Sequence, residues 1–99
     1  MWIHTIIQEN PGLDRDMIQN IQRSARSSAR NIAEGFGRHH HKENIQFCRI
    51  AKGSLHEIIE DLNIIKDEGK LNQLNFEEGR ILLSIALKSL NGCINYLLS

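Results

Sequence analysis

Hydrophobic residues recur at steps of three and four along almost the whole chain, and the strict alternation that marks half-buried strands is absent. Steps of three and four place apolar side chains on one side of an α-helix. Pro11 is the one proline in the sequence, so little interrupts such helices. The pattern predicts an all-α protein.

Four helices are expected, with boundaries set by local signals. The first ends at "ENPG", because proline cannot continue a helix. Gly69 is the expected left-handed cap of the third helix, and Asn75 with Glu78 three residues later resembles a capping box at the start of the fourth. The expected ranges are 2–8, 13–34, 42–67 and 75 to the C-terminus. Residues 1–99 should form one domain, an antiparallel up-down four-helix bundle with a short first helix.

The contact between the second and third helices should use small residues. Gly53 lies in mid-helix next to Ser54, where glycine costs about 1 kcal/mol relative to alanine. We expect Ala29 and Ala33 to meet this notch, so that the two backbones approach closely.

The last helix has more apolar surface than one seam needs. Its expected seam and the extra apolar residues beside it are Leu83, Ala86, Leu90, Cys93 and Leu97, and Ile81, Leu82, Ile85 and Ile94. A short first helix leaves part of this surface uncovered, which predicts contact with another subunit.

Formal charge is zero, with 12 basic and 12 acidic residues, but the two signs are separated along the chain. Residues 15–52 carry eight basic and three acidic side chains, a surplus of five positive charges. From residue 53 onward four basic residues face seven acidic ones. The molecule should therefore be electrically two-sided.

A stripe of Arg23, Arg26 and Arg30 lies on the second helix, at helical spacing and away from the expected core. The stripe is either an ordinary solvated face or part of a polyanion-binding surface. The turn "RHHHK" at 38–42 leaves three alternatives open: a metal site, a polyanion-binding edge or a solvated loop. If it binds polyanions, the candidate residues are Arg23, Arg26, Arg30, Arg38, His39, His40, His41, Lys42, Arg49 and Lys52. The histidines would add charge as pH falls toward the ordinary imidazole pKa of about 6.5.

Catalytic, cofactor and metal motifs are not found in the sequence. It contains no G-x-S-x-G, H-E-x-x-H, phosphate-binding glycine loop or dinucleotide fingerprint. Adjacent histidines in a loop rarely converge on one ion, so we expect no metal. Cys48 and Cys93 are interpreted as buried small hydrophobes in a reducing compartment. With no long uninterrupted apolar run and no signal peptide, we expect a cytoplasmic protein that is neither an enzyme nor bound to a membrane.

The stretches "NIAEGFGR" (31–38) and "KENIQFCRIAKGSLHEIIEDL" (42–62) resemble the bacterial 23S ribosomal RNA intervening-sequence protein family. Among the residues that carry the resemblance are Asn31, Glu34, Gly35, Gly53, Ser54 and Glu57. The resemblance implies antiparallel four-helix bundles in homopentameric rings, without an assigned enzymatic activity. A related protein, the accessory variability determinant of diversity-generating retroelements, binds nucleic acid and a reverse transcriptase through its basic surface.

Two departures from the family pattern concern the first helix and the approach to the motif. The first helix is about half the usual length, and Ser27-Ser28 stand where a proline usually precedes "NIAEG". The expected function is non-catalytic binding of RNA or DNA by an oligomer. The alternative is a scaffold that docks a partner enzyme such as a reverse transcriptase. No aromatic residue interleaves the basic stripe, so binding should rely on phosphate contacts.

Overall fold

Four α-helices make up the described part of the protein. A computed structural model describes the backbone of residues 2–36 and 41–98 and the side chains of residues 5–35 and 42–98. The helices are α1 (Trp2–Glu9), α2 (Arg15–Phe36), α3 (His41–Asp67) and α4 (Gln73–Leu98). No strand occurs within these ranges. The prediction of an all-α protein with a short first helix is confirmed, with every helix boundary within two residues of expectation.

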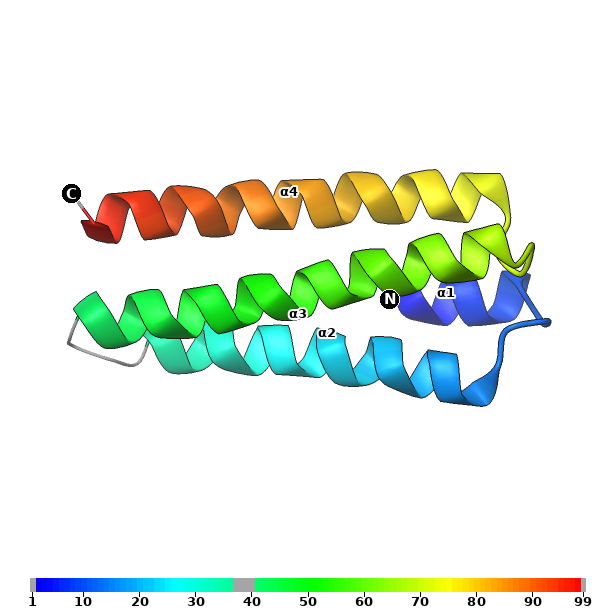
Figure 1. Ribbon diagram of the computed structural model, residues 1–99, viewed down its shortest axis with the longest axis horizontal. Coiled ribbons are helices and arrows are strands. Elements are labelled where there is room, and N and C mark those ends of the chain that lie inside the picture. The colour runs from blue at the N-terminus through cyan, green and yellow to red at the C-terminus, as the bar shows by residue number, and fades with distance from the viewer. Residues whose placement is uncertain (1, 37–40, 99) are drawn as a thin grey trace.

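Three long helices lie side by side, and α3 is the middle one (Figure 1). The chain reverses direction from α2 to α3 and again from α3 to α4 (Figure 1). The short α1 lies only at the end where α2 and α4 begin (Figure 1). The molecule is elongated, 44 by 20 by 20 Å. Beyond the reach of α1, the far halves of α2 and α4 have α3 as their shared neighbour.

Most of the core comes from α3, whose apolar side chains are buried at steps of three and four. Those of α3 are Ile45, Cys48, Ala51, Leu55, Ile58, Leu62 and Ile65. Leu62 and Ile65 are among the most completely enclosed side chains in the described chain. Each fully buried aliphatic side chain contributes roughly 1.5–3 kcal/mol, so α3 supplies the largest share of the hydrophobic stabilisation. Ile6, Ile21, Leu83, Leu90 and Ile94 bring the other three helices to this core.

Three asparagines join α1 to the start of α4. The Asn10 side chain donates to the Ile6 carbonyl at 2.9 Å and to Asn75 Oδ1 at 2.7 Å. The backbone N–H of Asn72 donates to Asn10 Oδ1 at 2.8 Å. Asn75 is 1% exposed, so its amide oxygen relies on these protein partners rather than on water.

The expected cap of α4 was wrong by three residues. Asn72 caps the helix, because the backbone N–H of Asn75 donates to Asn72 Oδ1 at 2.8 Å and Asn72 Nδ2 donates to Asn75 Oδ1 at 3.0 Å. The cap of α3 is as expected. Gly69 has φ of 73°, and its neighbour Lys70 donates from its backbone to the Ile65 carbonyl at 2.9 Å.

The predicted notch at Gly53 is also wrong. Ala29, Ala33 and Gly53 are all exposed, and a Cβ added at Gly53 would meet nothing within 4 Å. The next residue, Ser54, faces α2 instead, because one residue turns a helix by about 100°. The close approach occurs at Gly35, where an added Cβ would lie 2.6 Å from Asn44 Oδ1.

The outer face of α4 carries large exposed hydrophobic side chains. Ile81 and Ile85 are 61% and 58% exposed, and they point away from the buried Leu83 and Leu90. Leu74, Leu82, Tyr96 and Leu98 are exposed on the same helix, whereas Ile94, expected on this outer surface, is buried. By length and composition α4 could cross a membrane: an 18-residue stretch of it has a mean hydropathy of 1.5, and 17% of that stretch is buried. Polar residues interrupt the apolar residues of this helix, so the sequence pattern did not predict a membrane-spanning segment.

We predict that Asn75→Ala lowers the free energy of unfolding by about 2 kcal/mol, because it removes one buried and one part-buried hydrogen bond and leaves Asn10 with an unmatched donor. Asn95→Ala is the matched control on the same helix, where the side chain is exposed and the expected loss is below about 0.5 kcal/mol. Urea denaturation followed by circular dichroism measures both. Equal stability of the two variants would show that the asparagine cluster does not hold α1 to α4.

Candidate nucleic-acid interface

The arginine stripe of α2 lies on the solvent side of the helix. Arg23, Arg26 and Arg30 are all exposed. The side of α2 that faces α3 carries serines instead, with Ser24 donating to Glu57 Oε2 at 3.2 Å and Ser54 donating to Ser27 Oγ at 3.1 Å. Because the serines occupy the interhelical contact, the arginine side chains are left in water.

On α3, Lys42 and Arg49 are exposed and lie seven residues apart, which is two turns on one side of the helix. Arg30 lies six residues before the end of α2, and Arg49 lies eight residues after the start of α3. At about 1.5 Å per residue, both are roughly 10 Å from the α2–α3 connection. The basic residues of the two helices therefore gather at this end of the molecule, while Lys52 is half-buried.

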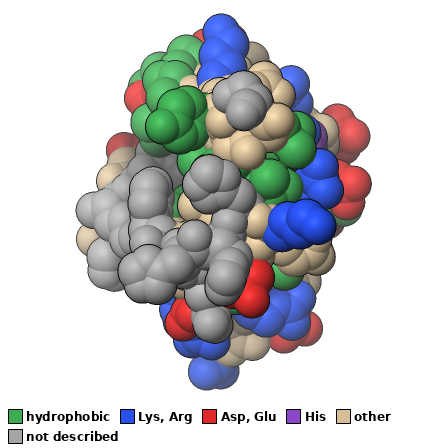
Figure 2. All heavy atoms as spheres, turned by 90° about the vertical axis from the view of Figure 1, so that its left-hand side faces the viewer, with side chains coloured by type: hydrophobic (Ala, Val, Ile, Leu, Met, Phe, Trp, Pro, Cys, Tyr) green, Lys and Arg blue, Asp and Glu red, His purple; other side chains and the backbone are tan. Residues whose placement is uncertain are grey.

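Figure 2 looks directly at this end. Lys and Arg side chains lie at several places around it, with Asp and Glu side chains between some of them (Figure 2). Arg38, His39 and His40 lie outside the described residues, and so does the side chain of His41, whose backbone begins α3. The three alternatives for the 38–42 turn therefore stay predictions.

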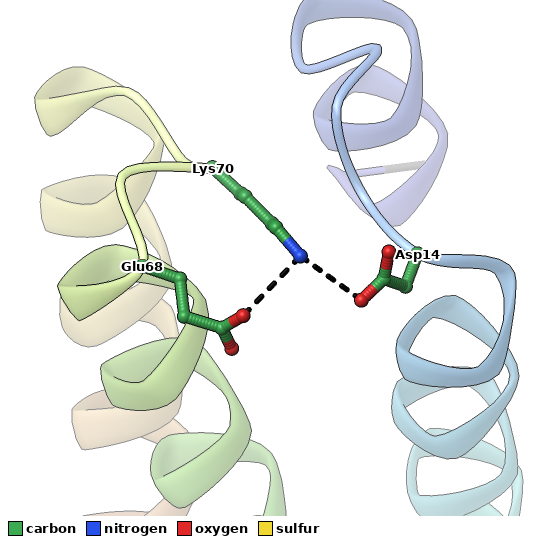
Figure 3. Close-up of polar contacts among 3 residues, drawn as sticks. All are labelled: Asp14, Glu68 and Lys70. Atoms are coloured by element: carbon green, nitrogen blue, oxygen red, sulfur yellow. Dashed lines mark hydrogen bonds and ion pairs between the residues drawn. The ribbon is translucent and has the colours of Figure 1, made fainter.

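Within the described part of the chain, no salt bridge joins Arg26, Arg30 or Arg49 to a carboxylate. The ion pairs there are those of Lys70, at 3.0 Å to Asp14 and 3.2 Å to Glu68. Figure 3 shows Lys70 between these two carboxylates, at the opposite end of the molecule. The hydrogen bond to Asp14, followed by that to Glu68, raises the pKa of Lys70. Lys70 is therefore paired with carboxylates at one end, whereas Arg26, Arg30 and Arg49 have no such salt bridge among the described residues at the other.

Arg23 differs from the other two arginines because it lies near an acidic cluster of Glu57, Glu60 and Asp61 on α3. Burial raises the pKa of Asp61, the carboxylates of Glu57 and Glu60 raise it further, and Arg23 lowers it. Arg23 also donates to Asn20 Oδ1 at 3.2 Å. The basic surface thus weakens toward the middle of the molecule, and its strongest part lies from Arg26 to the α2–α3 connection.

Three of the six motif residues lie in the contact between α2 and α3. Ser54 donates to Ser27, Glu57 accepts from Ser24, and Gly35 allows close contact. Asn31 Nδ2 donates to the Ser27 carbonyl at 2.8 Å, a bond within α2. Glu34 and Gly53 are exposed. The sequence prediction gave Ser24 no role and noted Ser27 only as standing where a proline usually precedes "NIAEG", so the contact of both serines with α3 was missed. Their spacing of three on the side of α2 between core and solvent was the available signal.

The described residues contain no group of three or more histidine, cysteine, aspartate or glutamate side chains placed to hold a metal ion. What this surface offers is exposed guanidinium and ammonium groups. Guanidinium groups bind phosphate and carboxylate oxygens with paired hydrogen bonds, so the surface suits a polyanion or an acidic protein.

Residues 2–92 match the protein-family model described as 23S rRNA-intervening sequence protein. The match includes the arginine stripe, the basic residues of α3 and the polar contacts between α2 and α3. None of the curated proteins compared with the chain matches it.

We predict that Asp61→Asn raises the free energy of unfolding at pH 7 by up to about 0.5 kcal/mol, a small gain because the group is partly exposed and water screens the repulsion. The pKa of Asp61 is raised in the folded state, so its charged form destabilises the fold. The parent should lose stability as pH rises through this pKa, and the variant should not. Thermal unfolding at pH 7 and near pH 3 tests this, since at the lower pH the parent carboxyl is protonated in both states and the gain should vanish. A gain of equal size at both pH values would exclude charge repulsion as its cause.

Proposed function

Because the chain belongs to the 23S rRNA-intervening sequence protein family, we propose that it is a non-catalytic, oligomeric protein that binds nucleic acid through a basic surface, with RNA as the first candidate. The single observation that supports this proposal is that, among the described residues, Arg26, Arg30 and Arg49 form no salt bridge with a carboxylate at the α2–α3 end. A solubilising face usually mixes charges of both signs. Glu34 and Glu43 also lie near this end, but the acidic cluster of α3, Glu57, Glu60 and Asp61, lies toward the middle, beside Arg23.

Self-association is part of the proposal. Each subunit is an antiparallel up-down bundle, and the exposed apolar side of α4 packs on another copy. Ile81, Ile85, Gly92 and Tyr96 fall on one side of α4 at steps of four and seven, which is a second seam opposite the core. The family resemblance implies a ring of five subunits.

Assembly makes a small patch effective. One subunit presents only a few unpaired cations, which bind phosphate weakly at physiological salt. A ring repeats this patch at fixed intervals around one rim, so a nucleic-acid strand that reaches several patches binds with much higher avidity. The overall neutrality of the chain is then no obstacle, because residues 53–99 carry seven of its 12 acidic residues and only four of its 12 basic ones.

The alternative is a protein-interaction scaffold. The same arginines would then dock an acidic surface of a partner enzyme such as a reverse transcriptase, as the resemblance to the accessory determinant of retroelements implies. The exposed apolar side of α4 favours this alternative, because nucleic acid offers no comparable apolar surface.

We predict that Arg26→Ala with Arg30→Ala weakens nucleic-acid binding at every salt concentration and reduces the slope of log affinity against log salt by roughly one to two units, since two phosphate contacts per subunit are lost. Fluorescence anisotropy with a labelled oligonucleotide at three salt concentrations measures both effects. Arg15→Ala with Lys88→Ala removes the same charge from exposed positions elsewhere and is the matched control.

The double arginine variant should bind at least tenfold more weakly than this control at the lowest salt concentration. Should both bind as tightly as the parent, the stripe is an ordinary solvated face and the scaffold becomes the leading function. Should both weaken equally, net charge rather than this surface governs binding.

We predict that Ile81→Glu with Ile85→Glu converts the oligomer to a monomer, because each subunit would bury two carboxylates in the proposed interface. Multi-angle light scattering should give about 11.4 kDa for the variant and about five times that mass for the parent. Ser84→Glu with Asn91→Glu places the same charges on another exposed side of α4 and should leave the oligomer intact. A monomeric parent would exclude the ring.

A further inference from the structure

Two cysteines on different helices lie at the same level of the molecule. Cys48 lies 19 residues before the end of α3, and Cys93 lies 20 residues after the start of α4. Each helix advances about 1.5 Å per residue, so both cysteines lie roughly 30 Å from the turn that joins α3 to α4. The two helices are neighbours with opposite directions (Figure 1), which brings Cys48 and Cys93 opposite each other.

Both cysteines belong to the same packed core. Cys48 is buried in the core, Cys93 is half-buried against the same core, and both are free thiols. Burial raises the pKa of Cys48, and the charge and hydrogen-bonding interactions with Cys93 raise it further. Cys48 Sγ also donates to Asn44 Oδ1 at 3.7 Å. The Cys48 thiol is thus protonated and shielded, and Cys93 is the more accessible of the pair.

We propose that Cys48 and Cys93 form a reversible dithiol–disulfide site that reacts with small-molecule disulfides such as oxidised glutathione. The Cys93 thiolate attacks one sulfur of glutathione disulfide, breaks its S–S bond and releases one glutathione thiol, leaving a mixed disulfide. Cys48 then loses its proton to solvent and attacks the Cys93 sulfur, forming the protein disulfide and releasing the second glutathione thiol. Two protein thiols are oxidised, and one glutathione disulfide is reduced to two thiols.

The bond would fasten α3 to α4 at the end where the basic surface lies. This is the end that α1 does not reach, so α4 is held there by its packing on α3 (Figure 1). Cys48 and Cys93 are 45 residues apart in sequence, and closing so long a loop removes much of the freedom of the unfolded chain. Oxidation should therefore stabilise the subunit, and reduction should restore the more easily opened form.

The test treats the native protein with oxidised glutathione and follows intact mass. The parent should lose two hydrogen atoms, carry no stable glutathione adduct and unfold roughly 10 °C higher than the reduced form. Dithiothreitol should reverse both changes. Cys48→Ala should hold one glutathione on Cys93, and Cys93→Ala should stay unmodified because Cys48 is buried.

Other outcomes would overturn the proposal. A parent that accumulates glutathione adducts without an internal bond has cysteines that cannot meet. A covalent dimer shows that Cys93 pairs between subunits instead. Reaction only in denaturant shows that the folded site is closed to disulfides. The parent measurement needs no variant, so it stands even where an alanine substitution prevents folding.

Discussion

The packing of α3 against both of its long neighbours is the interaction on which the rest of the structure depends. Toward α4 it presents large aliphatic side chains, and toward α2 it presents Ser54 and Glu57, which bond to serines. These contacts fix the rotation of α2 and α4 about their axes. Rotation in turn decides what each outer surface carries: cations on α2, and a second apolar side on α4.

The two outer surfaces are consequences of one arrangement. Had α1 extended along the whole molecule, its far half would cover more of the apolar residues on α2 and α4. Its eight residues reach only one end, where the asparagine cluster and Lys70 hold the turns together. The end without α1 also holds the cysteine pair and Arg26, Arg30 and Arg49, which have no carboxylate salt bridge among the described residues. The asparagine cluster and the Lys70 ion pairs thus lie at one end, and the basic surface lies at the other.

Much of this fold could be predicted from the sequence, because helix periodicity and proline and glycine signals are local. The start of α4 was displaced because Asn72 and Asn75 compete for the capping role, and the contact that decides between them comes from Asn10, more than sixty residues away. The notch at Gly53 failed for another reason. Composition indicates that small residues lie between two helices, but it does not say which of them do. The rotation of α3 about its axis places Ser54, and not the neighbouring Gly53, against α2.

The separation of basic and acidic residues was likewise visible in the sequence. The different surroundings of the arginines within one stripe were not. Arg23 and Arg30 look equivalent along the chain, and only the folded structure places Arg23 near Asp61.

The central claim is that a neutral chain presents unneutralised cations to nucleic acid. The most direct measurement is the ratio of absorbance at 260 and 280 nm of the protein purified at low salt. We expect a raised ratio that falls after a high-salt wash, and a ratio typical of protein alone before the wash would contradict the claim.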